Sequence, residues 1–300
     1  MLLRVGTRAS RLALAQTQWV IDGLQAVYPD IQAEIVTMET KGDRILDQPL
    51  EALGGKGLFV SEIEERLRQG RIDLCVHSMK DMPAEDSPGL RCARIWKRED
   101  ARDVLISKTG LPLEALPHGA KIATGSKRRA FQLLRLRPDV EVIPIRGNID
   151  TRLHMLEHSG LDAVVLAAAG LARLGLLNQV SEYFDAERMV PACAQGALGI
   201  QLRADDGALE RLLNALWDAE ADAQVAAERA FLQAAGGSCH MPIGAFCHFE
   251  GDTARIWTVL GDESGERLLR KDVTVPRSRA TQAADALGHE MQHMLKLNIV

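Results

Sequence analysis

The chain has 300 residues, of which 46% are hydrophobic and 26% are charged, so it can bury a substantial core and is long enough for two or three domains. Aromatic residues make up only 4% and the formal net charge is -5, which disfavours a nucleic-acid partner that binds by stacking or by an overall basic surface. Arginines interrupt the N-terminal apolar residues before signal-peptide length, and no later run approaches a membrane span. We therefore expect a cytoplasmic protein that binds neither nucleic acid nor membrane.

Five scattered cysteines, an odd number without a CxxC pair, disfavour both a disulfide framework and a structural zinc site. We expect most of them to be small buried residues. They are Cys75, Cys92, Cys193, Cys239 and Cys247.

Strand-like and helix-like segments alternate through roughly the first 200 residues, a pattern typical of α/β units around mainly parallel sheets. Helices are predicted at 11–27, 58–70, 127–136 and 148–160. Strands are predicted at 32–38, 72–78, 121–125, 140–146 and 162–170. These segments predict two α/β lobes.

The pattern changes after about residue 200, where 209–235 is strongly helical and three strands with turn residues between them follow. Those strands are predicted at 244–251, 254–261 and 267–275, before a last helix at 278–297. The fold class is therefore α/β with a small α+β C-terminal domain. The predicted domains are a discontinuous first lobe at 1–96 and 197–216, a second lobe at 97–196, and a third domain at 217–300.

Three turns carry arginines at predicted helix starts: VGTRASRLALAQ, ATGSKRRAFQLL and IPIRGNIDTR. At the carboxyl end of a strand, a helix N-terminus offers free N–H groups to an anion, and arginine forks suit carboxylates. Ser10 and Ser126 are candidate helix caps. The alternative for any single turn is a solvated surface arginine, but three such turns favour a ligand with many negative charges.

The segment HSMKDMP follows an apolar strand and places Lys80 and Asp81 at its carboxyl end, where active sites of α/β proteins lie. An ordinary turn in which the aspartate accepts backbone N–H bonds is the alternative.

Two other motifs point away from metal and nucleotide chemistry. HEMQH matches the zinc-protease pattern, but His289 and His293 fall opposite the apolar positions of their helix and should face water. GGKGLFV lacks the spacing and the hydroxyl residue of a phosphate-binding loop. We expect no metal.

The loop GGSCHMPIG contains a lone thiol, Cys239, among glycines and a proline. A metal ligand, a nucleophile, an attachment point and a small apolar turn residue are all open from these residues.

Taken together and in order, these segments resemble the porphobilinogen deaminase family. The resemblance runs through GTRASRLALAQ, TKGDRILD, GGKGLFVSEIE, DLCVHSMKDMP, ATGSKRR, IRGNIDTRL, QGALGI and GGSCHMPIGAF. It implies two lobes like periplasmic binding proteins and a third domain whose loop cysteine, here Cys239, forms a thioether to a dipyrromethane cofactor. A thiolate is suited to capturing the cationic species that forms when porphobilinogen loses ammonia.

The resemblance also implies the reaction and its residues. Four porphobilinogen molecules condense head to tail into hydroxymethylbilane, in haem and porphyrin biosynthesis, with Asp81 as the catalytic carboxylate that also contacts the cofactor. Phe59 would cover the cleft. The residues implied in cofactor binding are Ser78, Lys80, Thr124, Ser126, Arg128, Arg129 and Arg152. Those implied in substrate binding are Arg8, Ser10, Gln16, Arg146, Arg152 and Gln195.

Departures from the family pattern are few. Ala194 stands where glycine is common, and Cys193 beside it is a second candidate thiol near the cleft. Ser238 and Ala101 replace a common glycine and proline, and no charged or attachment residue is lost. A binding module without catalysis remains the alternative, although it leaves Cys239 unexplained. We expect porphobilinogen as the small-molecule partner, and a monomer.

Overall fold

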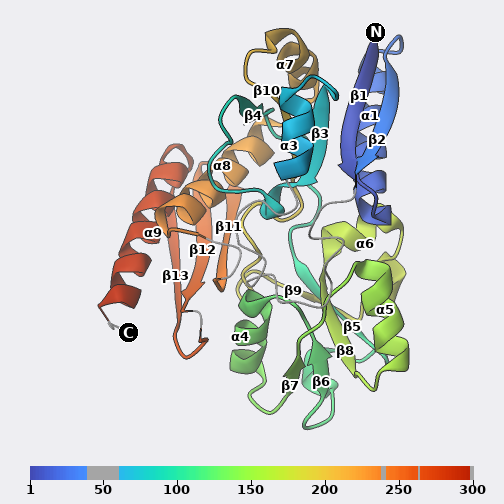
Figure 1. Ribbon diagram of the computed structural model, residues 1–300. Coiled ribbons are helices and arrows are strands. Elements are labelled where there is room, and N and C mark those ends of the chain that lie inside the picture. The colour runs from blue at the N-terminus through green and yellow to red at the C-terminus, as the bar shows by residue number, and fades with distance from the viewer. Residues whose placement is uncertain (39–60, 238–240, 263, 298–300) are drawn as a thin grey trace. The chain divides into compact units, whose positions relative to one another are not determined.

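The computed structural model describes residues 1–38, 61–237, 241–262 and 264–297 (Figure 1). Within them, the chain divides into two compact units, Met1–Arg98 with Ala197–Asp222, and Glu99–Gly196 with Ala223–Val300. The second unit contains both the predicted second lobe and most of the predicted third domain. No helix of the described residues is long and apolar enough to cross a membrane.

The first unit is built on a five-stranded mixed sheet with the order β2-β1-β3-β10-β4. Strands β1, β2 and β3 are parallel, whereas β10 runs antiparallel to β3 and β4. Its strands are β1 (Leu2–Arg8), β2 (Gln32–Met38), β3 (Leu74–Ser78), β4 (Leu90–Cys92) and β10 (Leu198–Arg203). Its α-helices are α1 (Arg11–Val27), α3 (Ser61–Arg68) and α7 (Gly207–Leu213).

Helix α1 buries one apolar stripe, on which Val20, Ile21 and Leu24 recur at helical spacing. This stripe packs into a core cluster with Leu3 and Val5 of the central strand β1. Covering the sheet in this way fixes the turn between β1 and α1 at the carboxyl edge of the parallel strands.

The second unit begins with another five-stranded mixed sheet, of order β7-β6-β8-β5-β9. Strands β6, β7 and β8 are parallel, and β5 is antiparallel to β8 and β9. The strands are β5 (Asp103–Ser107), β6 (Lys121–Ala123), β7 (Glu141–Ile143), β8 (Ala163–Ala167) and β9 (Glu182–Phe184). The α-helices are α4 (Lys127–Leu136), α5 (Ile149–His158) and α6 (Ala168–Leu174).

The C-terminal part of the same unit is an antiparallel three-stranded sheet with two helices. Its elements are α8 (Ala219–Ala234, which begins in the first unit), β11 (Ile243–Glu250), β12 (Thr253–Gly261), β13 (Leu268–Pro276) and α9 (Ala280–Lys296). Phe231 of α8 and Met291 of α9 are fully buried in one cluster with alternate residues of β11 and β12. Cys193 lies in this cluster as well, so the small sheet packs on the segment that ends the second lobe.

The structure confirms the fold class of two α/β lobes and a small α+β part. Helices α1 and α4 and strand β2 have the predicted bounds.

Two expectations about the secondary structure need correction. The sheets are mixed, because β5 and β10, which the sequence reading missed, run antiparallel to their neighbours. The helical stretch 209–235 is two α-helices, because the carboxylate of Asp218 caps the start of α8 by accepting the N–H groups of Glu220 and Ala221 at 3.0 Å.

Candidate functional site

In the first unit, the predicted residues gather at the carboxyl ends of β1 and β3. These strands are parallel neighbours, so Arg8 at the end of one and Ser78 at the end of the other share an edge of the sheet. The buried Gln16 of α1 donates from Nε2 to the Ser78 hydroxyl at 2.9 Å. Ser10 caps α1, since its hydroxyl accepts the N–H of Ala13, as predicted.

Lys80 and Asp81 lie in a 3-10 turn, Met79–Asp81, that follows β3 directly. The turn is anchored to the rest of the unit, because Met79 is buried and its N–H donates to the carbonyl of Ala197 at 3.0 Å. Lys80 is half-buried and Asp81 is exposed. Asp81 is therefore exposed to solvent at the edge of the sheet where Arg8 also lies.

A buried polar network beneath this edge was missed by sequence reasoning. Cys75 and His77 alternate along β3 onto one face, with His77 Nε2 and Cys75 Sγ 3.2 Å apart. Gln201 of β10 donates from Nε2 to Glu64 Oε1 of α3 at 2.7 Å and lies 3.5 Å from the Cys75 thiol. Burial lowers the pKa of His77 to about 4, against the opposing attraction of Glu64, so the imidazole is neutral at pH 7.

In the second unit, Thr124 and Ser126 form the turn between β6 and α4. Ser126 caps α4 by accepting the N–H of Arg129, as predicted. Arg128 and Arg129, in the first turn of that helix, are only 4% and 5% exposed, so they are not solvated surface residues. The helix dipole disfavours cations at this end, and their burial therefore requires an acidic partner.

That partner is Asp103, the first residue of β5, which is completely buried. Its Oδ2 accepts from Arg128 Nη1 at 2.6 Å, and its Oδ1 accepts from Arg129 Nη2 at 2.7 Å and from Gln195 Nε2 at 2.9 Å. Burial alone would raise the pKa of Asp103, but the two guanidinium groups outweigh it and lower the pKa well below its usual range. The carboxylate and the two guanidinium groups together carry one net positive charge, which suits an anionic ligand.

The turn with Arg146 and Arg152 lies beside the turn that precedes α4. Gly125 approaches so closely that a Cβ on it would be 2.5 Å from the carbonyl oxygen of Ile145 and 3.9 Å from Arg152 Nη2. Arg152 is held in place by a hydrogen bond from Nε to the carbonyl of Gly147 at 2.9 Å, and Asn148 caps α5. The structure therefore brings two of the three predicted arginine turns together within the second unit.

The segment that leads to Gln195 is tied to the C-terminal part of the same unit. Ala194 has a φ of +60°, the left-handed region, which no other non-glycine residue of the described chain adopts. Its N–H donates at 2.6 Å to the carboxylate of Glu228, a fully buried residue of α8. The positive φ explains why this position favours glycine.

Cys193 is not a reactive thiol in this arrangement. It is 4% exposed, and burial raises its pKa to about 12, so the thiolate is not populated near neutral pH. Cys75 and Cys247 are buried as well, as expected of most of the cysteines, and Cys92 is half-buried.

Two predicted site residues, Phe59 and Cys239, lie outside the described residues. The HEMQH motif lies on α9, with His289 and His293 both exposed and Met291 buried between them, as predicted.

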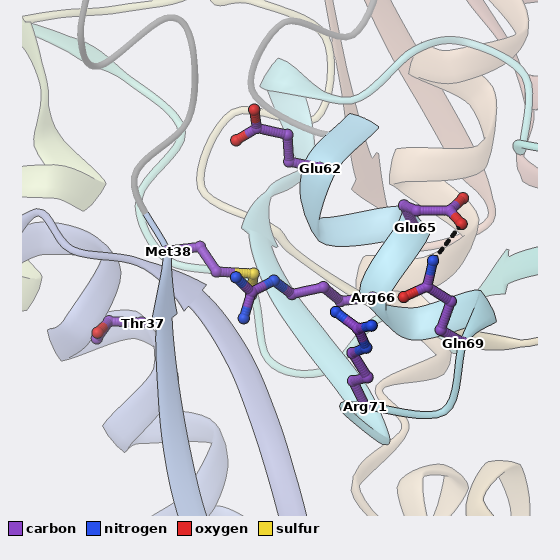
Figure 2. Close-up of a pocket in the computed structure, with 7 residues that line it drawn as sticks. All are labelled: Thr37, Met38, Glu62, Glu65, Arg66, Gln69 and Arg71. Atoms are coloured by element: carbon purple, nitrogen blue, oxygen red, sulfur yellow. Dashed lines mark hydrogen bonds between the residues drawn. The ribbon is translucent and has the colours of Figure 1, made fainter.

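A hollow of about 560 Å³ lies between the end of β2 and α3, lined by Thr37, Met38, Glu62, Glu65, Arg66, Gln69 and Arg71 (Figure 2). None of the predicted site residues lines this hollow. It lies next to the two ends of the segment 39–60, which is outside the described residues, and it is not the candidate functional site.

Family models match nearly the whole chain. The model for "Porphobilinogen deaminase, dipyromethane cofactor binding domain" matches residues 3–211, and the model for "Porphobilinogen deaminase, C-terminal domain" matches residues 223–296. The porphobilinogen deaminase of Clostridioides difficile is 45% identical over 96% of this chain and 98% of its own length. That of Lachnospira eligens is 48% identical over 98% and 99%. Among solved structures, the methionine-binding protein MetQ aligns with 14% identity and a TM-score of 0.44 over 76% of this chain and 94% of its own.

The protein has two α/β lobes, with a candidate catalytic carboxylate in one and buried arginines in the other. Its sequence similarity places it among the transferases of tetrapyrrole biosynthesis. The chain belongs to the porphobilinogen deaminase family. Its cofactor is dipyrromethane. The donors in the second unit fit such a group, since each of its pyrroles carries carboxylates and the close approach at Gly125 places Arg152 beside the hydroxyl residues Thr124 and Ser126.

Proposed function

We propose that this chain condenses four porphobilinogen molecules head to tail into hydroxymethylbilane with release of ammonia, with Asp81 as the catalytic carboxylate and Cys239 as the attachment point of dipyrromethane. The observation that carries the proposal is the match of both family models across the chain together with the clustering of arginine turns in the second unit. A binding module without catalysis would not need an exposed carboxylate at the edge of the sheet where Arg8 and Lys80, which attract anionic ligands, also lie.

Asp81 acts on the pyrrole N–H groups of bound porphobilinogen. Its carboxylate accepts their hydrogen bonds and stabilises the positive charge that develops as ammonia leaves. It is exposed in the described structure, and bound pyrroles displace the water around it. Opposite charges 4 Å apart interact by about 1 kcal/mol in water and about 4 kcal/mol at an effective dielectric of 20, and the latter corresponds to roughly a thousandfold in rate.

Polar residues of the first unit bind the carboxylate groups of the substrate and of the cofactor. Arg8, Ser10 and Gln16 bind the substrate, while Ser78 and Lys80, at the same edge of the sheet, bind the cofactor. We expect Phe59 to contact the bound substrate, and Arg146, Arg152 and Gln195, which belong to the second unit, to bind carboxylates of the growing chain. The function of these residues is to orient the pyrrole rings, because a correctly placed reactant needs no further ordering at the moment of reaction.

Residues of the second unit also bind the cofactor. Dipyrromethane, when bound, supplies the free pyrrole carbon at which the chain grows. Arg152, Thr124 and Ser126 bind its carboxylates directly, and Arg128 and Arg129 add positive potential from their buried positions beside Asp103. We expect the protein to work as a cytoplasmic monomer.

The decisive experiment compares the denatured intact mass of the wild type with that of a Cys239→Ser variant, with Cys92→Ser as the matched control. The wild type and the control should exceed their sequence masses by one dipyrromethane, and Cys239→Ser should not. A wild type of unmodified mass that also gains none on incubation with porphobilinogen would contradict the proposal.

Asp81→Asn tests the catalytic role separately. It should retain the covalent cofactor by mass and yet turn over porphobilinogen about a thousandfold more slowly than the wild type. Near-normal turnover by this variant would remove Asp81 from the mechanism, whatever the mass experiment gives.

A further inference from the structure

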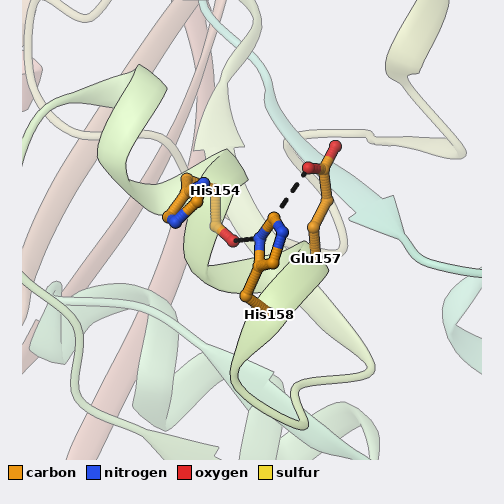
Figure 3. Close-up of side chains that lie close together, drawn as sticks. All are labelled: His154, Glu157 and His158. Carbon is orange, nitrogen blue, oxygen red and sulfur yellow. Dashed lines mark hydrogen bonds and ion pairs between the residues drawn. The ribbon is translucent and has the colours of Figure 1, made fainter.

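The last two turns of α5 carry three side chains that ligate metal ions in other proteins. His154, Glu157 and His158 are all exposed, and one ligand atom of each lies within 4.8 Å of the others (Figure 3). In the part of the chain that the structure describes, they form the one group of this kind. None of them belongs to the site proposed for tetrapyrrole synthesis.

The spacing of the two histidines places them on one face of the helix, since residues four apart are neighbours there. Their rings stack with centroids 4.1 Å apart and planes inclined by 26°. Two nitrogen ligands at about 2.0–2.1 Å from one ion lie at most about 4 Å apart. Ligand atoms within 4.8 Å of one another are close to this limit, and rotation of the exposed side chains can bring both rings to a common ion.

A hydrogen bond within the helix prepares His158 for this role. Its Nδ1 lies 2.9 Å from the carbonyl oxygen of His154. A carbonyl can only accept, so Nδ1 carries the proton and the lone pair of the neutral ring is on Nε2. Histidine ligands of metal ions are oriented by this kind of bond from the second ring nitrogen.

The surrounding charge also favours a cation. The carboxylate of Glu157 lies 3.9 Å from Nδ1 of His158, and both side chains are more than half exposed. The cluster occupies the C-terminal end of α5, which is the negative end of the helix dipole. A divalent ion here gains from the helix dipole and from the carboxylate.

We propose that His154, His158 and Glu157 form a surface site for one divalent transition-metal ion of borderline softness, such as Zn²⁺, Ni²⁺ or Co²⁺. Two imidazoles and one carboxylate suit these ions, whereas Mg²⁺ and Ca²⁺ prefer ligand sets made of oxygen. Water fills the remaining positions, because the side chains are exposed. Binding ties two turns of the helix together and makes the folded state more stable in proportion to the ion's occupancy.

The test is calorimetric titration of the untagged holoenzyme with Ni²⁺ alone at pH 7.5. The wild type should bind one ion at this site. His158→Ala should weaken the binding by more than about 100-fold, which is the most that loss of a residue hydrogen-bonded to a metal ligand costs. Glu157→Gln should weaken it less, and lowering the pH to 5.5 should weaken the wild type, because the ion competes with protons for the imidazoles.

The double variant His289→Ala, His293→Ala is the matched control, because it removes the other exposed histidine pair of the same spacing. It should retain the binding that His158→Ala loses, and the thermal midpoint should rise with Ni²⁺ in the wild type and in this control alone. Porphobilinogen turnover without Ni²⁺ should be the same in all these proteins. Binding that survives in a His154→Ala, His158→Ala variant, or that is lost only in the control, would overturn the proposal.

Discussion

The buried carboxylate of Glu228 accepts a hydrogen bond at 2.6 Å from the N–H of Ala194, whose backbone is in the left-handed region. The same carboxylate accepts the N–H of Cys247 at 2.9 Å. Glu228 thus joins α8, strand β11 and the segment before Gln195, which itself donates to Asp103. A strained turn at the candidate site is therefore held by a residue of the C-terminal part of the chain.

Replacing Glu228 by Gln should lower the free energy of unfolding by about 2–3 kcal/mol, because hydrogen bonds to a charged group are lost and an amide N–H₂ then faces a backbone donor. Urea unfolding measures this. Gln233→Ala, at an exposed position of the same helix, should change the free energy by less than about 0.5 kcal/mol. Equal effects of the two substitutions would contradict the role of Glu228.

Replacing Ala194 by Gly should stabilise the protein. The left-handed conformation destabilises the folded state by about 1–2 kcal/mol when the residue has a Cβ, and glycine removes this cost. Glycine also gives the unfolded chain more conformational entropy, which lowers stability by about 0.4–1 kcal/mol, so a net gain of about 0.5–1 kcal/mol is expected. Gly175→Ala is the converse control, since Gly175 has a φ of +70° and a Cβ there meets nothing within 4 Å. It should lose about 0.5–1 kcal/mol in the same urea experiment, because the same two effects act there in the opposite direction. Destabilisation by Ala194→Gly would show that the turn has another conformation.

Replacing Asp103 by Asn should lower the free energy of unfolding by about 3–5 kcal/mol, because two guanidinium groups at 4% and 6% side-chain exposure lose their counter-ion. Glu210→Gln is a fitting control, since it removes the ion pair with Arg91, in which both side chains are about one-third exposed. That change should cost no more than about 1 kcal/mol. A loss for Asp103→Asn as small as that of the control would mean that the buried guanidinium groups find other partners.

The stability of the protein should fall as the pH is lowered from 7 to 4, in part because of His77. The unfolded chain binds a proton at this imidazole near pH 6.5, but the folded state, in which burial lowers the pKa to about 4, binds it only at lower pH. The stabilisation is therefore fully present above pH 6.5 and is lost as the pH falls through this window, by about 3 kcal/mol in total.

Urea unfolding of the wild type and of His77→Gln at pH 7 and pH 4.5 isolates this contribution. The variant should lose less stability between the two pH values than the wild type does. His118→Gln, at an exposed position, should follow the wild type. Identical pH dependence of the wild type and His77→Gln would show that His77 does not remain neutral in the fold.

Much of this protein can be read from local sequence. Apolar spacing and a serine cap define α1 and α4, and strand-end motifs place Asp81 and the arginine turns at the carboxyl edges of parallel strands. The order of the motifs was enough to indicate the family. These features depend on residues a few positions apart, which one sequence displays directly.

The tertiary structure alone decided which buried groups meet. Asp103 contacts Arg128 across 25 positions and Gln195 across 92, and Gln201 reaches Glu64 across 137. All three pairs depend on the antiparallel strands β5 and β10, which carry Asp103 and Gln201 and pair with strands from distant parts of the chain. Such pairs leave no periodic signal in the sequence. They form because a polar or charged group that leaves water must find a partner, and only the folded backbone determines which partner lies within reach.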